Sequence, residues 1–189
     1  MEVLAGVLLL LLLVDLLLTV GVIRRLREHT QKLAELEAGM SGRQTLSGPR
    51  TGSPVPEFPA TPAAGGGVVS PEGLRSGITY LAFYSAGCGA CEDDLLPWGE
   101  HLRATAGSGA AAFAVVEVPD DEGGSVLADR LSEVMSGMGG VVREGIRGPL
   151  QAAFDISAFP SYVVVEDGVV TEVTHQAARL TAPVGARSA

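Results

Sequence analysis

The sequence predicts an α/β domain with a central mixed sheet flanked by helices, preceded by one transmembrane helix and a flexible linker. Three observations support this prediction. Residues 3–23 are almost wholly apolar, residues 39–67 are rich in Gly, Pro, Ser and Thr, and short apolar segments alternate with helix-like segments from residue 78 onward. Alternating strands and helices favour a parallel sheet with covering helices, and a closing hairpin adds an antiparallel edge. A chain of 189 residues is long enough to bury one such core.

Residues 1–23 are expected to anchor the chain in a membrane. The run from Val3 to Ile23 carries a single charge, at Asp15, and about 20 apolar residues suffice to span the hydrocarbon core. The start, Met1-Glu2, is not basic and no clear cleavage site follows, so an uncleaved anchor is favoured over a signal peptide. Asp15 is costly within the span and indicates a helix contact or local hydration.

Residues 24–38 predict a short juxtamembrane helix that continues the anchor. Their apolar positions form a partial helical stripe that is too short for the several heptads of a coiled coil. Residues 39–53 are expected to be a flexible linker, because such a composition cannot bury enough apolar surface to offset the entropy of ordering it. The soluble domain is then expected over residues 54–189.

The basic residues beside the anchor bear on which side of the membrane carries the domain. Nothing basic precedes the span, and four basic side chains follow it: Arg24, Arg25, Arg27 and Lys32. The positive-inside rule would place the domain in the cytoplasm. The family resemblance described below favours the extracytoplasmic side. We expect the extracytoplasmic placement, although the charge rule opposes it.

The domain begins with a predicted central strand over residues 78–85. This segment, ITYLAFYS, is nearly all apolar, β-branched or aromatic, as in a strand buried on both faces. The later elements are expected in this order: helix 91–106, strand 110–118, helix 121–137, short strand 140–142, compact helix 147–156 and two strands within 159–174. Asp167-Gly168, between the last two strands, is a strong hairpin signal.

Two of these helices carry apolar side chains that should face the sheet. In the helix over 121–137, the inward positions are expected to be Val126, Leu127, Leu131 and Val134, because they recur at helical spacing. Trp98, in the helix over 91–106, is expected to be packed core.

The only two cysteines in the chain, Cys88 and Cys91, follow the predicted central strand and begin a helix. Unpaired backbone N–H groups and the helix dipole stabilise an anion at that position. Because the thiolate is the nucleophile in disulfide exchange, we expect Cys88 to attack. Cys91 lies one turn further along and can resolve the mixed disulfide. The pair therefore predicts a redox centre.

Other uses of the two cysteines are less well supported. A structural disulfide across two residues gains little loop entropy. A structural zinc site needs four ligands, and His29, His101 and His175 do not stand at zinc-motif spacing. We therefore expect no metal and no organic cofactor. The net charge of −9 argues against nucleic acid as a partner, and the pattern that precedes a peroxidatic cysteine is absent before Cys88.

Two segments carry a resemblance to a known family. They are YLAFYSAGCGACEDDLLPW and, further along, DISAFPSYVVVEDGVV, and together they resemble the thioredoxin fold. The residues before the central strand are similar to those of the membrane-anchored TlpA branch, which includes MauD-like accessory proteins. The motifs are a Pro-x-Phe entry at Pro56 and Phe58, a Gly-x-x-Val-Ser segment at residues 66–70, and a Leu-x-x-Gly step after it. The resemblance covers residues 53 to about 175.

The resemblance implies roles for further residues. Pro160 would be the cis proline that lies against the disulfide, and Phe159 before it would narrow the substrate groove. Asp94 stands near a position where TlpA-type proteins often carry Glu, so Asp94 and Glu92 are candidates for acid-base work. The alternative is that these acids are solvated and complement the helix dipole.

Two positions depart from the family pattern. Gly87 stands where thioredoxin-like proteins usually have Trp, and Ala82 occupies the position of the buried acid of classical thioredoxins. These departures favour an alternative function, a thioredoxin-like binding or assembly module with little redox turnover.

The prediction is a membrane-anchored thiol-disulfide oxidoreductase that exchanges a Cys88/Cys91 disulfide with partner proteins. The partners would be protein dithiols or disulfides, such as a membrane electron donor, an apo-cytochrome or an enzyme subunit under maturation. Gly89-Ala90 between the cysteines matches neither strongly oxidising nor strongly reducing family members, so it does not predict the direction of electron flow.

Overall fold

The computed structural model describes residues 48–118 and 125–181. The predicted anchor over 1–23 and the juxtamembrane helix over 24–38 lie outside the described residues. Among the residues that the structure describes, no helix has both the length and the apolar character needed to cross a membrane.

A five-stranded mixed sheet organises the described chain. Its strands lie in the order β5-β4-β3-β6-β7. Their bounds are β3 Ile78–Ser85, β4 Ala111–Glu117, β5 Gly140–Glu144, β6 Ser161–Glu166 and β7 Val169–Thr174. Strand β3 pairs in parallel with β4 and antiparallel with β6. The predicted mixed sheet, with a parallel part and a closing antiparallel hairpin, is therefore confirmed.

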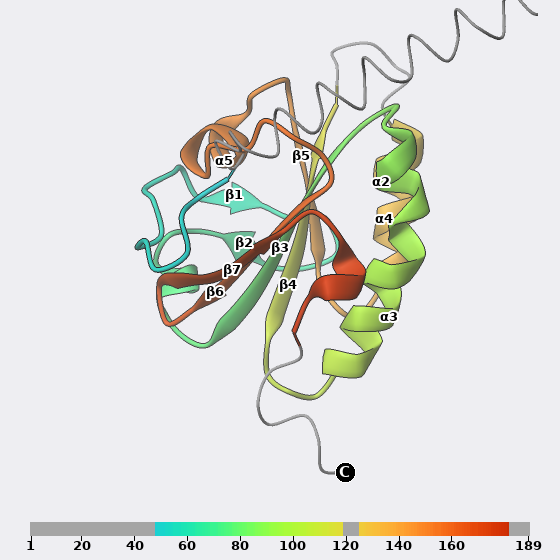
Figure 1. The fold of residues 1–189 in the computed structure, drawn as a ribbon. Helices are drawn as coiled ribbons and strands as arrows, with labels where there is room; N and C mark the ends of the chain where they lie inside the picture. The colour runs from blue at the N-terminus through green and yellow to red at the C-terminus, as the bar shows by residue number, and fades with distance from the viewer. Residues whose placement is uncertain (1–47, 119–124, 182–189) are drawn as a thin grey trace, which may run out of the picture. The chain divides into compact units, whose positions relative to one another are not determined.

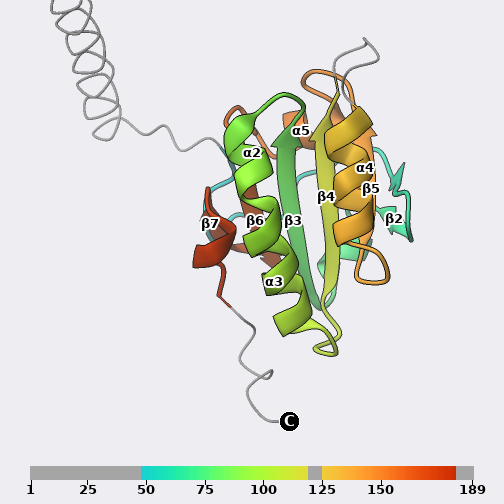
Figure 2. The same ribbon diagram turned by 90° about the vertical axis from the view of Figure 1, so that its right-hand side faces the viewer.

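Helices cover both faces of this sheet. On one face lie α2 Gly89–Asp93, α3 Leu95–Thr105 and α4 Ser125–Val134, and Figure 2 shows α3 and α4 lying over the sheet, roughly along the direction of its strands. On the other face lie α5 Pro149–Ala153 and the small hairpin of β1 Thr61–Pro62 and β2 Val68–Val69, at the left of Figure 1. Two short 3-10 turns, η1 Gly73–Arg75 and η3 Ala177–Arg179, complete the described elements.

The apolar run of β3 is explained by this two-sided cover. Tyr80, Ala82 and Tyr84 belong to the core under α3 and α4, whereas Leu81 and Phe83 belong to the core under α5. Successive side chains of a strand point to opposite faces, so both sets are buried. The predicted double burial of this strand is confirmed.

The helices differ in detail from the sequence prediction. The helix expected over 91–106 breaks at Asp94 into α2 and α3. Trp98 is fully buried, as predicted. In α4, Leu127 and Leu131 face the core, but Val126 is 65% exposed. The prediction for Val126 was wrong, because Val126 and Leu127 are adjacent and project about 100° apart around the helix.

Asp167-Gly168 forms the predicted hairpin turn between β6 and β7. Both residues have positive φ, 48° and 81°, as a type I′ turn requires. The Asp167 carboxylate also accepts a hydrogen bond from the Gly77 N–H at 2.9 Å. This contact ties the hairpin to the residue that precedes β3.

The ordered domain begins earlier than residue 54. The Gly52 N–H donates to the Val170 carbonyl at 2.7 Å, and the Val170 N–H donates to the Ser53 carbonyl at 2.9 Å. Residues 52–53 therefore pair with the outer edge of β7, and the linker predicted over 39–53 extends too far. The linker was predicted because residues of this composition cannot form an apolar core. Pairing with a strand edge needs only backbone N–H and C=O groups, so composition does not exclude it.

The opposite edge of the sheet is covered in the same way. Ala64 and Val141 of β5 exchange both backbone hydrogen bonds at 2.8 Å. The hairpin of β1 and β2, which brings Ala64 there, was missed by the sequence prediction, because it lies in a stretch of Gly, Pro and Ala without alternating apolar residues.

Candidate active site

The two cysteines lie where β3 gives way to α2. Strand β3 ends at Ser85, and Gly87 follows with φ +76°. This conformation favours glycine and turns the chain into the helix. Cys88 is the N-cap of α2.

Cys88 and Cys91 form a disulfide. Cys88 is half-buried, whereas Cys91 is 0% exposed. The backbone N–H of Cys91 donates to Cys88 Sγ at 3.2 Å. The same N–H would stabilise a Cys88 thiolate in the reduced chain. Of the two sulfurs, Cys88 is therefore the one that a partner can reach.

Phe159 and Pro160 lie beside this disulfide, as the resemblance implies. The Phe159–Pro160 peptide is cis. The carbonyl oxygen of Phe159 lies 3.8 Å from Cys88 Sγ, and the ring of Phe159 is half-buried against both cores. The structure thus brings together Cys88, Cys91, Phe159 and Pro160.

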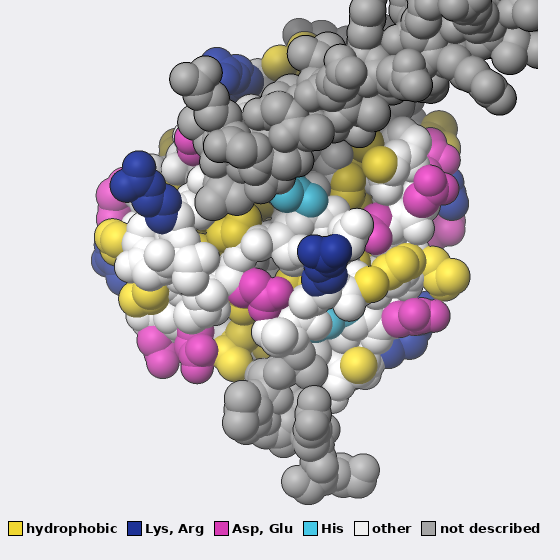
Figure 3. All heavy atoms as spheres, in the orientation of Figure 1, with side chains coloured by type: hydrophobic (Ala, Val, Ile, Leu, Met, Phe, Trp, Pro, Cys, Tyr) yellow, Lys and Arg dark blue, Asp and Glu magenta, His cyan; other side chains and the backbone are white. Residues whose placement is uncertain are grey.

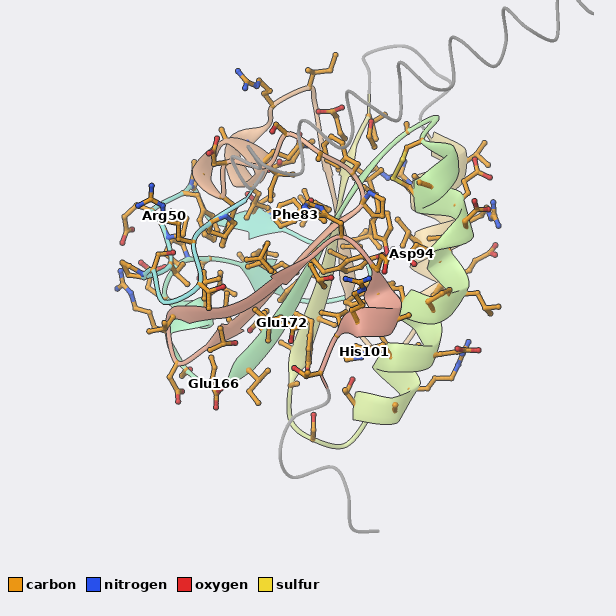
Figure 4. All side chains as sticks on the ribbon, in the orientation of Figure 1. Arg50, Phe83, Asp94, His101, Glu166 and Glu172 are labelled. Carbon is orange, nitrogen blue, oxygen red and sulfur yellow. A yellow bond between two sulfur atoms is a disulfide. The ribbon has the colours of Figure 1, made fainter. Side chains whose placement is uncertain are left out.

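Asp94 is an anchored group and not a solvated one. It lies at the junction of α2 and α3, beside η3 (Figure 4). Its Oδ2 accepts hydrogen bonds from the Tyr162 hydroxyl at 2.5 Å and from the Ala177 N–H at 2.8 Å. The alternative of a purely solvated acid therefore does not describe Asp94, although as the N-cap of α3 it still lies where a negative charge complements the helix dipole.

Glu92 has a different environment from Asp94. Its side chain is exposed and forms an ion pair with Arg130 of α4 at 3.2 Å. An exposed ion pair of this kind contributes little stability. Glu92 fits the solvated interpretation, whereas the Asp94 carboxylate is held by Tyr162 and Ala177.

Two buried tyrosines extend the contacts of Asp94 into the sheet. The hydroxyls of Tyr84 and Tyr162 lie 2.9 Å apart. Because Tyr162 donates to the carboxylate, Tyr84 must donate to Tyr162. Burial raises the pKa of Tyr84, and burial together with the neighbouring Tyr84 raises that of Tyr162. Both hydroxyls therefore stay protonated, and the chain of donors runs from Tyr84 to Asp94.

The tyrosine pair lies in the same buried core as Ala82. Ala82 is fully buried and lies opposite Tyr162 in the register of β3 and β6. Cys91 belongs to the same buried core as Tyr84 and Tyr162. Sequence reasoning missed the tyrosines, although Tyr80 and Tyr84 on one face of a buried strand were a signal that hydroxyls would need partners.

A second carboxylate supports the loop that carries the cysteines. Glu117, at the end of β4, accepts from the Ser85 hydroxyl at 3.1 Å and from the Arg147 N–H at 3.3 Å. Its backbone carbonyl also accepts from the Ala86 N–H at 2.9 Å. Within the described ranges, no group of three or more His, Cys, Asp or Glu side chains is placed to hold a metal ion.

Charged groups are mixed over the surface seen in Figure 3. Acidic and basic side chains alternate there, with hydrophobic side chains scattered between them. That face shows no broad patch of one charge.

Comparisons with known proteins identify the fold. No protein-family model matches the chain, and no curated protein matches it. Solved structures do match. The thioredoxin domain of a thiol-disulfide oxidoreductase from Bacteroides vulgatus has a TM-score of 0.51 and 17% identity, covering 67% of this chain and 89% of that one.

Two further structures give the same result. A thiol:disulfide interchange protein from Bacteroides sp. has a TM-score of 0.51 and 18% identity, covering 69% of this chain and 84% of that one. StoA from Bacillus subtilis has a TM-score of 0.51 and 18% identity, covering 65% and 90%. The chain therefore has the thioredoxin fold, with a Cys-x-x-Cys disulfide at the start of α2 and a cis proline beside it.

Proposed function

We propose that the protein is a thiol-disulfide oxidoreductase that exchanges the Cys88–Cys91 disulfide with partner proteins. The observation that carries the proposal is the asymmetry of the pair. Cys88 Sγ is accessible, accepts the Cys91 N–H and faces the peptide before a cis proline, whereas Cys91 is buried. An attacking thiol must be reached by its partner, and a resolving thiol need not be.

The exchange consists of two balanced steps. The Cys88 thiolate attacks a partner disulfide, a bond between Cys88 and the partner forms, and the partner's second sulfur leaves as a thiolate. Cys91, after loss of its proton, attacks Cys88 Sγ, reforms the disulfide and releases the partner's first sulfur. Two electrons pass to the partner, whose thiolates take up protons. The reverse sequence oxidises a partner dithiol.

We propose Asp94 as the acid that supports the proton movements of Cys91, three residues before it in the chain. Asp94 directly follows α2, and the Tyr162 hydroxyl holds its carboxylate in place. Its acid-base role rests on the resemblance to TlpA-type proteins together with this anchored position. Glu92 is excluded from that role in our proposal, because it is exposed and paired with Arg130.

We further propose that residues 1–23 anchor the chain in a membrane and present the domain on the extracytoplasmic side. The apolar run over residues 3–23 supports the anchor, and the TlpA-like motifs support the extracytoplasmic side. Suitable partners are protein dithiols or disulfides near the membrane surface, including an electron donor that regenerates the reduced pair.

The test is the reduction potential of the Cys88/Cys91 pair. The full chain, solubilised in detergent, is equilibrated with glutathione buffers of graded ratio, and the free thiols are trapped and counted. We expect one reversible two-electron transition, whose midpoint defines the direction of electron flow. The variant Cys91→Ala should accumulate a mixed disulfide with glutathione, and Cys88→Ala should not.

A second candidate function is a binding or assembly module with little turnover. The observation that favours it is Ala82, which is fully buried where classical thioredoxins carry an acid. A pair that cannot be reduced and reoxidised reversibly would support this function over the oxidoreductase.

A further inference from the structure

The loop that carries the cis proline is held by two side chains from outside the cysteine motif. The Ser161 hydroxyl donates to the Ala158 carbonyl at 2.7 Å. His175 Nδ1 lies 3.1 Å from the Pro160 carbonyl oxygen and 3.0 Å from Ser161 Oγ. His175 directly follows β7, so these contacts join the neighbouring ends of β6 and β7.

The hydrogen bonds fix which nitrogen of His175 carries the proton. A carbonyl oxygen only accepts, so the contact with Pro160 requires Nδ1–H. Ser161 already gives its proton to Ala158 and accepts from His175 through a lone pair. Neutral His175 is therefore the Nδ1–H tautomer, and protonation at Nε2 leaves this donor in place.

Three successive carbonyls in the loop consequently have three different partners. Those of Ala158 and Pro160 are occupied by Ser161 and His175, while that of Phe159 faces Cys88 Sγ at 3.8 Å. These contacts fix the Ala158–Phe159 and Pro160–Ser161 peptides, and the Phe159–Pro160 peptide between them directs its carbonyl oxygen toward the reacting sulfur.

We propose that His175 is a positioning residue, whose Nδ1–H fixes the Pro160 carbonyl so that the Phe159 backbone is presented to a substrate peptide beside Cys88. The inference rests on the proposed exchange activity. It predicts that His175 contributes to the binding of peptide substrates and not to the chemistry of the disulfide itself.

Two substitutions of His175 distinguish the effect of the Nδ1–H donor from the effect of the side chain's shape. The amide nitrogen of Asn can take the place of Nδ1, so His175→Asn retains the donor. His175→Leu has a similar shape without it. Gln176→Ala is the matched control, because Gln176 is the exposed neighbour and its side chain has no role in the loop.

The variants are compared as full chains in detergent, with insulin as peptide substrate and dithiothreitol as reductant. We expect His175→Leu to raise the KM for insulin about fivefold, the effect of one net hydrogen bond. His175→Asn and Gln176→Ala should stay within about twofold of the wild type. Direct reduction of the Cys88–Cys91 disulfide by dithiothreitol should be equal in all four proteins, because dithiothreitol has no peptide backbone to bind.

Equal KM values for His175→Leu and the wild type would overturn the inference, as would impairment of His175→Asn to the level of His175→Leu. Slower reduction of His175→Leu by dithiothreitol would also overturn it, because the effect would then be on the disulfide.

Nitrogen NMR shifts of His175 give a readout independent of activity. An Nε2–H neutral ring contradicts the positioning contact, whereas an inactive wild type with the Nδ1–H tautomer contradicts only the proposed function.

Discussion

Cys88 and Cys91 differ in how much of each side chain reaches solvent. Cys88 is half-buried and Cys91 is fully buried. In the reduced chain near neutral pH, we expect iodoacetamide to modify Cys88 at least about tenfold faster than Cys91, since accessible thiolate governs the rate. Mass spectrometry of the digested protein measures both rates.

The single-cysteine variants provide the control for this measurement. Cys91→Ser should be labelled as fast as Cys88 in the wild type, and Cys88→Ser should be labelled slowly. Comparable rates at the two positions would contradict the assignment of Cys88 as the attacking thiol.

The hydroxyl of Tyr162 is the central member of the chain from Tyr84 to Asp94. Tyr162→Phe removes the hydrogen bond to the Asp94 carboxylate and leaves the buried Tyr84 hydroxyl and the half-buried carboxylate without their partner, so we expect a loss of about 2–3 kcal/mol in unfolding free energy. Tyr84→Phe removes only the outer donor and should cost about 1 kcal/mol. Urea unfolding of a fragment of residues 46–189 measures both.

The double variant separates this network from simple loss of packing. When Tyr162 is already Phe, the Tyr84 hydroxyl has no partner in the chain, so the second substitution should cost less than it does alone. Strictly additive losses would show that the two hydroxyls act independently.

Individual site residues were predictable from sequence to different degrees. Cys88, Cys91 and Pro160 are marked by residue type and by position relative to a buried strand. The partners of Asp94 are not, because Tyr162 and Ala177 stand 68 and 83 residues further along the chain. Only the fold brings them to the carboxylate, and the same holds for His175 and the Pro160 carbonyl.

At the scale of elements, α3 packs on β3 through His101. The ring of His101 meets Tyr80 edge-on at 4.8 Å and stacks on Trp98 at 6.0 Å. Burial lowers the pKa of His101 below its ordinary value of 6.5. The unfolded chain therefore binds this proton at a higher pH than the folded chain does. The contribution of His101 to stability is complete above about pH 6.5 and is lost as the pH falls below it.

We expect the free energy of unfolding of the 46–189 fragment to fall between pH 7.5 and 5.5. His101→Phe, which keeps an aromatic ring and removes the titrating group, should reduce this fall. Urea titrations at the two pH values make the comparison. An unchanged pH dependence in the Phe variant would assign the effect to other groups.

Elements with strong local signals were predicted, and those made by tertiary contact were not. Strand β3, the turn at Asp167-Gly168 and the helix at residues 149–153 follow from apolar runs, turn residues and helical spacing. The pairing of β1 with β2 has no such signal, because two-residue strands carry no periodicity. The break at Asp94 did have a sequence signal that the prediction passed over: Pro97 has no N–H to donate to the Asp93 carbonyl, and its ring clashes with that carbonyl in a continuous helix.

At the scale of the whole domain, part of each outer edge of the sheet is covered, because residues 52–53 pair with Val170 of β7 and Ala64 pairs with Val141 of β5. Exposed edges promote association between chains. A fragment of residues 55–189 loses the two hydrogen bonds between Val170 and residues 52–53. We expect it to be about 2 kcal/mol less stable than the fragment of residues 46–189 and to self-associate more readily.

Urea unfolding and sedimentation velocity of the two fragments test this prediction. Substituting Gly52 and Ser53 by Ala in the longer fragment serves as a control for composition, because the backbone hydrogen bonds remain possible. Equal stability of the two fragments would mean that residues 46–54 lie on the domain without supporting it.

The path of the chain before β3 has a mechanical consequence. Residues 52–53 pair with β7, which is an outer strand, whereas β3 lies in the middle of the sheet. A pulling force applied through the N-terminal end therefore loads the two bonds to Val170, and then the bond from the Val55 N–H to the Gly168 carbonyl, before it reaches β3. These bonds can open one after the other while the central strands, the disulfide and the cis proline loop stay intact. A force on the N-terminal end would therefore extend the segment around residues 52–53 first. The cysteine site would be deformed only after that segment has separated from β7.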